Sequence, residues 1–426
     1  MASSLRSGKI LATAVMMLPA YLAPGTAAAA PAAISIGLDN RFSDNVSKTR
    51  SDTESDIESR ITLNIDKSGE PGWCNYSLGG GIGYAVWHED TFDPEIFTDG
   101  RLSGQCEITP NLIWQTSDRI KQVTQDNRNP DTPDNLTRKN TFRTGPVYSL
   151  RLTQVDIVQL SASYENTEFE EPEEADSNRV LGAVSYTHLF SPTFRAGLSV
   201  SAERTELDTE EELDREAVSL TFGKQWANTS LSGALGVNQL ENSQGNSEVS
   251  SEGISGNLRL NRQITESSNL SLAIDRQLTD QSSTVGLDFD NFSFDLENTS
   301  AVEVTTLSLG YRNSLSSGGS LSSELEASQT EYLESGETEN RERLSVNYSR
   351  PISGVSSFSA RASYQLSSFT DGTDDRVGEV SLGYTHNISG GLSLQSRIGR
   401  ELKRSDVRQR EYDENWVLIA INYAFQ

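Results

Sequence analysis

The chain ends in the stretch NWVLIAINYAFQ, residues 415–426, whose pattern decides the expected fold. One set of alternate positions is apolar and closes with two aromatic residues: Val417, Ile419, Ile421, Tyr423 and Phe425. The positions between them are small or mixed in character: Leu418, Ala420, Asn422 and Ala424. Alternation with a period of two predicts a β-strand with one apolar face and one face of polar or small residues.

The same alternation recurs along most of the chain, for example in IVQLSASY at residues 157–164 and again at 194–203 and 392–398. Beyond the N-terminus there is no apolar run of the roughly 18 residues that a membrane-spanning helix needs. The mean hydropathy of −0.49 is nevertheless compatible with a membrane protein, because a transmembrane strand turns only alternate residues toward lipid. The sequence therefore predicts an all-β protein with lipid-facing strands.

The connections between the predicted strands fall into two classes. One set is short and rich in Ser, Gly and Pro, and the other is longer and mostly acidic, including Glu241–Ser250 and Asp280–Ser300. This asymmetry predicts a single transmembrane antiparallel up-and-down β-barrel of about 20 strands (18–22), with short periplasmic turns and long acidic extracellular loops. The competing interpretation is a soluble β-solenoid, whose repeats would be shorter and whose turns would be alike at both ends.

Aromatic residues recur at one height, on the apolar face a few residues before a short turn. Amphipathic rings prefer the headgroup level of a bilayer, so we expect an aromatic girdle formed by Tyr186, Tyr311, Tyr348, Tyr384, Tyr423 and Phe425.

Residues 1–30 have the features of a secretory signal peptide. Two basic residues precede the apolar stretch Ile10–Leu22, and small residues follow it. We expect cleavage after Ala29 or Ala33, which leaves one barrel domain, residues 31–426. A mitochondrial-type presequence and a core helix are the alternatives.

The two cysteines, Cys74 and Cys106, fall on neighbouring predicted strands near the periplasmic end. If this pair of strands turns near residue 90, the two side chains face each other. Exported proteins fold in an oxidising compartment, so the sequence predicts a cross-strand disulfide. Two free buried thiols are the alternative.

A barrel of about 20 strands is wide enough to enclose an aqueous lumen. The inward positions are mostly Ser, Thr, Gly, Asn and Gln, and the candidate lumen-lining charges are Arg195, Arg259, Arg312, Arg361, Arg397, Glu203, Asp275, Glu324 and Glu326. The segment Asp280–Ser300 is long enough to fold inward as a plug. Inward arginines oppose the cation preference of an acidic exterior, so we expect no strong ion selectivity.

The net charge of −26 makes nucleic acid a poor partner. Acidic clusters on predicted external loops either keep the surface solvated or bind Ca²⁺ or Mg²⁺ between loops; they are Glu168–Glu174, Glu206–Glu212 and Glu331–Glu339. No other cofactor is expected.

Few residues suggest catalysis. The chain contains three histidines, His88, His188 and His386, and no GxSxG motif. Two of the histidines occupy the same place in the repeat, just before a turn, which favours an interfacial position. We therefore predict no enzymatic activity, with an outer-membrane hydrolase as the weakest alternative.

The terminal strand resembles the C-terminal strand of bacterial outer-membrane β-barrels. The stretch NPDTPDNLTRKNTFRTGPVYSLRL, residues 129–152, and SIGLDNRFSDNVS, residues 35–47, are similar to proteobacterial outer-membrane barrels associated with exopolysaccharide or exosortase (PEP-CTERM) export systems. The resemblance implies an integral outer-membrane protein of a Gram-negative bacterium. Its implied partners are outer-membrane lipid and lipopolysaccharide, the barrel-assembly machinery and, more loosely, polysaccharide export components.

Two functions are compatible with these features. The favoured one is a porin-like, water-filled channel or conduit for small solutes or exported polysaccharide. The alternative is a closed structural or binding barrel that anchors surface polysaccharide or a partner complex.

Overall fold

The computed structural model describes residues 32–171, 174–209, 211–244, 247–280, 301–333 and 335–425. The predicted signal peptide, residues 1–30, and the predicted plug, apart from Asp280, lie outside these ranges. Among the described helices, none is both long enough and apolar enough to span a bilayer.

The described chain is built almost entirely from β-strands. In chain order the strands are β1 (Ala33–Ser43), β2 (Asp56–Gly69), β3 (Cys74–Trp87), β4 (Glu95–Thr109), β5 (Leu112–Thr124), β6 (Leu136–Arg151), β7 (Asp156–Phe169), β8 (Ser177–Ser191), β9 (Phe194–Leu207), β10 (Glu211–Gln225), β11 (Thr229–Gln244), β12 (Ser247–Thr265), β13 (Ser268–Asp280), β14 (Ala301–Ser314), β15 (Ser320–Tyr332), β16 (Thr338–Pro351), β17 (Ser356–Phe369), β18 (Asp374–Ser389), β19 (Leu392–Ser405) and β20 (Tyr412–Phe425). Two short 3₁₀ helices, η1 (Pro133–Asn135) and η2 (Arg408–Arg410), lie in connections.

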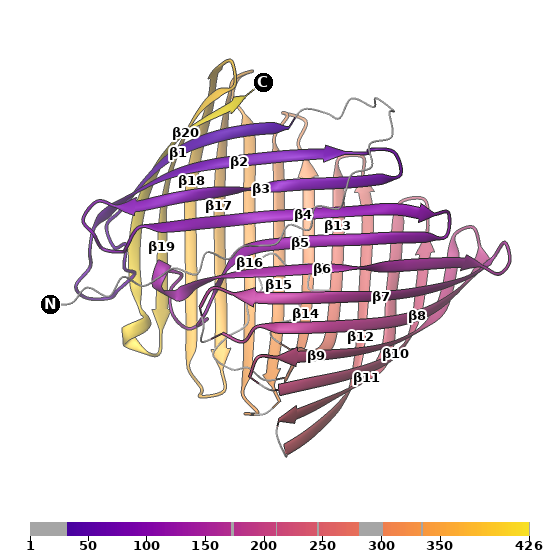
Figure 1. Cartoon of the computed structure of the whole chain (residues 1–426). Coiled ribbons are helices and arrows are strands. Elements are labelled where there is room, and N and C mark those ends of the chain that lie inside the picture. The colour runs from indigo at the N-terminus through magenta and orange to yellow at the C-terminus, as the bar shows by residue number, and fades with distance from the viewer. Residues whose placement is uncertain are drawn as a thin grey trace.

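Each strand pairs antiparallel with its neighbours in sequence, and the last strand pairs with the first. The closing ladder runs from Ile34 opposite Phe425 to Ser43 opposite Trp416. The result is a closed antiparallel barrel of 20 strands, which confirms the predicted fold class. In Figure 1 the near-wall strands lie crosswise to the far-wall strands, as the tilt of barrel strands requires.

The outer face of the barrel is apolar. The alternate residues of β20 from Val417 to Phe425 expose 39–51% of their surface, and Leu220 on β10 and Leu235 on β11 expose 64% and 62%. A continuous apolar belt on the outside of a barrel packs against no other part of the protein. It therefore lies in the hydrocarbon core of the bilayer. The terminal stretch that indicated the fold is therefore part of the lipid-facing wall and closes the barrel.

The connections differ between the two ends of the barrel. At the end that holds both strand termini, which is the periplasmic end in this class, the turns span residues 70–73, 110–111, 152–155, 192–193, 226–228, 266–267, 315–319, 352–355 and 390–391. The external connections include the longer loops 44–55, 88–94, 125–135 and 406–411.

One predicted loop is wrong, and one turn escaped prediction. Residues 241–250 were expected to be a loop, but β11 and β12 stay paired as far as Gln244 opposite Ser247. Where strands project beyond the bilayer, water contacts both of their faces. Alternate residues there need not be apolar, so the sequence lacks the period-two pattern from which a strand is predicted. The turn 266–267 contains neither Gly nor Pro, the usual turn signals.

Candidate functional site

The candidate site is the barrel lumen, and the alternation of the strands defines which residues face it. All nine predicted lumen-lining charges occupy positions that alternate with exposed apolar residues of the outer belt: Arg195 and Glu203 on β9, Arg259 on β12, Asp275 on β13, Arg312 on β14, Glu324 and Glu326 on β15, Arg361 on β17 and Arg397 on β19. They are spread around the wall, and no two of the five arginines are register partners in the described ladders.

Glu203 belongs to a buried ion-pair network near the external end. It accepts a hydrogen bond from Arg215 at 2.7 Å and lies 3.5 Å from Arg179. Arg179 also lies 3.3 Å from Glu165 and donates to Thr205 at 3.0 Å. These charged side chains on β7 to β10 pack inside the barrel and fill part of the external half of the lumen.

Beside this network, the ends of two strands turn into the lumen. The ladder between β12 and β13 stops at Gly256 opposite Arg276, whereas β13 and β14 continue together to Asp280 opposite Ala301. Leu278 and Ala301 then pack against Leu213 of β10 and Leu240 of β11 in a buried cluster. This apolar contact narrows the external mouth on that side.

On the opposite side, loops 44–55 and 125–135 fold inward and meet β19 and β20. Lys48 binds Asp131 of the second loop and lies 3.1 Å from Glu401 and 3.9 Å from Glu414. Burial alone would lower the pKa of Lys48, but these three carboxylates outweigh burial and hold its pKa above the ordinary value. We call this set of contacts the mouth latch.

Loop 125–135 is attached to the wall at a second point, beside the mouth latch. Lys403 of β19 donates to the carbonyl oxygen of Arg128 at 2.7 Å, and the Arg128 guanidinium lies 3.3 Å from Asp371 and over the ring of Phe369. The loop leaves the wall between β5 and β6, yet its contacts are on β17 to β19 and the loop after β17. It therefore extends past the ends of β1 to β4 and across part of the mouth.

Two cavities lie along the inner wall among the residues that the structure describes. The larger, about 1250 Å³, is bordered by β1 to β7, and the smaller, about 670 Å³, extends toward the periplasmic end beside β3 to β9. Both are bordered by Ser103, Ser117 and Arg143, so the two cavities adjoin. The smaller cavity is lined mainly by Ser, Gln, Asn and small residues.

Three glycines create room in the larger cavity. Gly79, Gly81 and Gly83 stand at consecutive inward positions of β3, which therefore presents bare backbone to the lumen. A Cβ at Gly81 would lie 2.2 Å from the side-chain oxygen of Asn64, and one at Gly79 would lie 2.7 Å from a carboxylate oxygen of Asp66. The β2 side chains thus lean over β3 into space that only glycine leaves free.

The basic residues of this cavity are not among the predicted lumen-lining charges. Arg60, Arg101, Arg119, Lys121 and Arg143 all line it, on β2, β4, β5 and β6. The available signal was three glycines at alternate positions of one strand, flanked by strands with inward arginines.

The predicted girdle residues lie on the outer face near the periplasmic turns. Tyr186 donates to Asp156 at 2.6 Å, and the ring nitrogen Nδ1 of His188 lies 2.7 Å from the same carboxylate. At the equivalent place on β17 and β18, Tyr384 and His386 are hydrogen-bonded to Ser356. Tyr311 and Tyr348 occupy matching positions on β14 and β16, and Tyr423 stacks edge-on against Phe425 at 4.9 Å.

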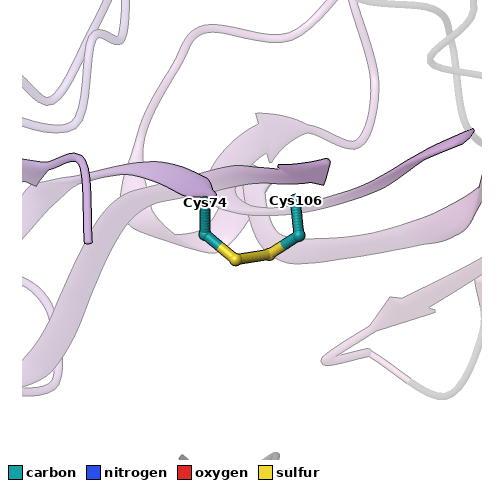
Figure 2. Close-up of a disulfide and its surroundings, with 2 residues drawn as sticks. All are labelled: Cys74 and Cys106. Atoms are coloured by element: carbon teal, nitrogen blue, oxygen red, sulfur yellow. A yellow bond between two sulfur atoms is a disulfide. The ribbon is translucent and has the colours of Figure 1, made fainter. Parts of the chain in front are cut away.

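Cys74 and Cys106 are direct register partners at the periplasmic ends of β3 and β4, and a disulfide joins them (Figure 2). The bond closes a sequence separation of 32 residues. It joins the glycine strand β3 to β4 at the periplasmic end of the wall.

Among the residues that the structure describes, no three His, Cys, Asp or Glu side chains are grouped so as to hold a metal ion. Divalent-cation binding at the acidic external loops stays a prediction.

Comparison with solved structures finds other outer-membrane barrels. A mutant of the ferric enterobactin receptor PfeA from Pseudomonas aeruginosa has a TM-score of 0.50 and 10% identity, covering 92% of this chain and 80% of that one. The outer-membrane protein OpdK from the same organism has a TM-score of 0.39 and 11% identity, covering 93% and 99%. No family model matches the sequence, and no curated protein matches it. With its closed barrel and apolar belt, the chain is an integral protein of the bacterial outer membrane, in contact with outer-membrane lipid.

Proposed function

We propose that the protein is a water-filled outer-membrane channel, without catalysis, for small solutes or exported polysaccharide. One observation carries the proposal: the inner wall beside β1 to β9 is largely polar and borders two adjoining cavities, of about 1250 Å³ and about 670 Å³. A barrel of this strand number is too wide for its own side chains to fill, and a polar wall favours water in the remaining space.

The mouth latch implies a channel that is closed at rest toward the exterior. Its contacts are ion pairs and hydrogen bonds between loops and wall, so it can open without breaking the barrel ladder. The lumen below it stays accessible from the periplasmic side, the side from which an exported solute would enter.

Two features support a polysaccharide as cargo. The stretch 129–152 is similar to barrels associated with exopolysaccharide export, and the lower lumen is lined with hydroxyl and amide groups that hydrogen-bond sugars. Periplasmic polysaccharide export components are the corresponding partners. The barrel-assembly machinery is the partner proposed for insertion, because the terminal strand resembles the signal that it reads.

The second candidate is a closed barrel that anchors surface polysaccharide or a partner complex. The packed external mouth favours it, since the latch and the leucine cluster together obstruct the lumen.

Planar-bilayer recording separates the two candidates. The wild-type barrel is compared with a variant in which residues 126–134 are replaced by a short Gly-Ser linker. Steps of conductance in either protein support a channel, with larger or more frequent openings expected in the variant. Absence of conductance in both, for protein that still shows the heat-modifiable migration of a folded barrel, would establish the closed barrel instead.

A further inference from the structure

We propose that the outer face of the barrel selects anionic phospholipid in the leaflet that faces the periplasm. The proposed site is a ring of basic side chains just beyond the apolar belt, which we call the periplasmic collar: Lys67 on β2, Lys224 on β10, Arg262 on β12 and Arg350 on β16. The collar binds the headgroup phosphate of a lipid with a net negative charge. The inference concerns the outside of the wall, so it does not depend on whether the lumen conducts.

Strand alternation places the collar on the lipid side of the wall. Alternate residues of a strand face the same side of a sheet, and each collar residue comes two positions after an outward residue of the belt or girdle: Lys67 after Ile65, Lys224 after Phe222, Arg262 after Leu260 and Arg350 after Tyr348. The collar is therefore one outward step nearer the periplasmic turns than the belt. On β8 and β18 the same place is taken by His188 and His386.

Lipid headgroups lie at this level of the wall. The girdle tyrosines beside the collar prefer the boundary between hydrocarbon and headgroups. On the periplasmic side, three of the collar residues are followed, two positions later, by another exposed apolar side chain: Trp226, Ile264 and Ile352. Apolar side chains favour the membrane surface over water. These turns therefore stay close to the bilayer and hold the collar cations within the headgroup layer.

The collar cations have no carboxylate partner in the described part of the chain. None of the collar residues forms an ion pair there. Lys224 donates to the Thr193 hydroxyl at 3.0 Å and lies over the rings of Phe194 and Trp226. An ammonium group has three donors, so Lys224 keeps donors for a phosphate oxygen.

The acidic side chains nearest the collar are engaged elsewhere or lie in the turns. Asp156, on the outer face, accepts a hydrogen bond from Tyr186 and lies beside His188. Glu70 and Glu266 are exposed in periplasmic turns, where salt and water screen them from the collar. The outer face at the level of the collar is therefore locally basic.

The external edge of the belt has a different arrangement of charge. Outward arginines there lie no farther than 3.9 Å from a carboxylate oxygen: Arg138 from Glu170, Arg204 from Asp214, Arg276 from Glu303, Arg376 from Asp374 and Arg404 from Asp413. Arg400, on the external half of β19, has no such partner among the described residues and is isolated. The chain is rich in carboxylates, with a net charge of −26. Unpaired cations around one edge of so acidic a protein indicate a counter-charge from outside the chain.

A lipid phosphate supplies that counter-charge. Arginine binds phosphate through two parallel N–H groups, and lysine binds it as a point charge. A zwitterionic headgroup cancels the charge of its phosphate with its own cation, whereas phosphatidylglycerol does not. The collar therefore favours the anionic lipid, although the net charge of the whole protein would repel it. The sign of the lipid preference thus separates the collar from the overall charge.

The test is electron paramagnetic resonance of spin-labelled lipids in phosphatidylcholine vesicles that contain the folded barrel. Phosphatidylglycerol and phosphatidylcholine with the same labelled acyl chain are compared, and the immobilised fraction of each gives the ratio of their association constants. Each basic residue near the surface favours an anionic lipid by about fivefold at low salt. The measured ratio averages over all lipids around the barrel, so it should lie above one and fall in about 1 M salt.

Two triple variants locate the preference. Lys224→Gln/Arg262→Gln/Arg350→Gln removes three collar charges and should bring the ratio to one or below, because the remaining net charge is negative. Arg195→Gln/Arg312→Gln/Arg397→Gln removes the same charge from the lumenal face of the wall. This matched control should keep the wild-type ratio.

Three results would overturn the collar: a wild-type ratio of one or below, an unchanged ratio in the collar variant, or an equal loss in the lumenal control. Folding of every variant is checked by heat-modifiable migration. If the triple collar variant does not fold, the single variants Arg262→Gln and Arg350→Gln, at exposed positions, should each lower the ratio part of the way, and no change in either would reject the proposal.

Discussion

Replacing Lys48 with methionine should open the external mouth. The Lys48 side chain is only 6% exposed and is surrounded by Asp131, Glu401 and Glu414. Methionine keeps much of the side-chain length but removes the charge, which leaves the Glu414 carboxylate, 1% exposed, without this cation. Breaking one side of a buried ion pair typically costs about 3–5 kcal/mol.

Because each 1.4 kcal/mol is a factor of ten in an equilibrium constant, that loss corresponds to a shift of roughly two to more than three powers of ten from closed to open. Arg41 remains 2.8 Å from Glu414, so we expect a result near the lower end. A mouth that is rarely open in wild type should therefore be open for a large part of the recording in the variant.

Single-channel recording in planar bilayers measures this open fraction directly. Lys224→Met is the matched control, because Lys224 lies at the periplasmic end beside Phe194 and Trp226, and its open fraction should equal that of wild type. Asp131→Asn should have a much smaller effect, under about tenfold, since this carboxylate is 67% exposed and screened by water. An unchanged open fraction in a folded Lys48→Met barrel would refute the latch.

Further predictions concern the disulfide, the lipid face, acid and metal ions. Replacing Cys74 and Cys106 with serine should lower the free energy of unfolding by up to about 4 kcal/mol in the chain-entropy model for a 32-residue separation; equal urea midpoints on heat-modifiability gels would contradict this. Leu220→Arg, on the outer belt, should cost about 2–4 kcal/mol, and Thr221→Arg, facing the lumen, should cost far less; similar losses would mean that the faces are wrongly assigned. Hydrogen bonds from Thr373 and the nearby Arg128 and Arg410 hold the pKa of Asp371 below its ordinary value of 3.8. A lowered carboxyl pKa stabilises the contact between Asp371 and Arg128 of loop 125–135 at higher pH, and this stability is lost as pH falls through the folded-state value, so the open fraction should rise below about pH 4. Calcium titration of the acidic external loops should give binding heat at millimolar ion, and its absence would leave them a solvating role alone.

The sequence predicted the barrel because period-two alternation is a local property. The residues that face lipid are alternate residues of a single strand, and the girdle tyrosines recur at similar distances from the turns. The cross-strand pairing of Cys74 and Cys106 could also be predicted from local sequence, because both lie on one hairpin and the position of its turn places them opposite each other.

The latch could not be predicted in the same way. Lys48 meets Glu401 across a sequence separation of 353 residues, and no local pattern specifies how a loop folds back into a lumen. The basic cluster of the cavity was missed for a related reason. Alternation assigns Arg101 to the inner face, but only the register makes Arg119 its partner, and a shift of two residues would separate them.

The chemistry of the mouth bears on whether it is closed permanently. An ion cluster such as Lys48 with its three carboxylates gains little net stability over a set of apolar side chains packed in the same space, because desolvation of all the charges offsets most of the Coulomb attraction. A permanent seal would be better made from contacts like the leucine cluster around Leu213.

The mouth has apolar packing where the strand ends of the wall turn inward and ion pairs where its two loops attach. Ion pairs break into well-solvated groups when water enters, whereas an opened leucine cluster exposes apolar surface. The loops therefore form the part of the closure that can move, and the wall beside β13 and β14 forms the fixed part. Hydrogen exchange should follow this division, with faster exchange at Val46 and Gln125, whose amides are hydrogen-bonded within the loops, than at Leu278 on the strand; equal protection of all three would show a mouth that does not open.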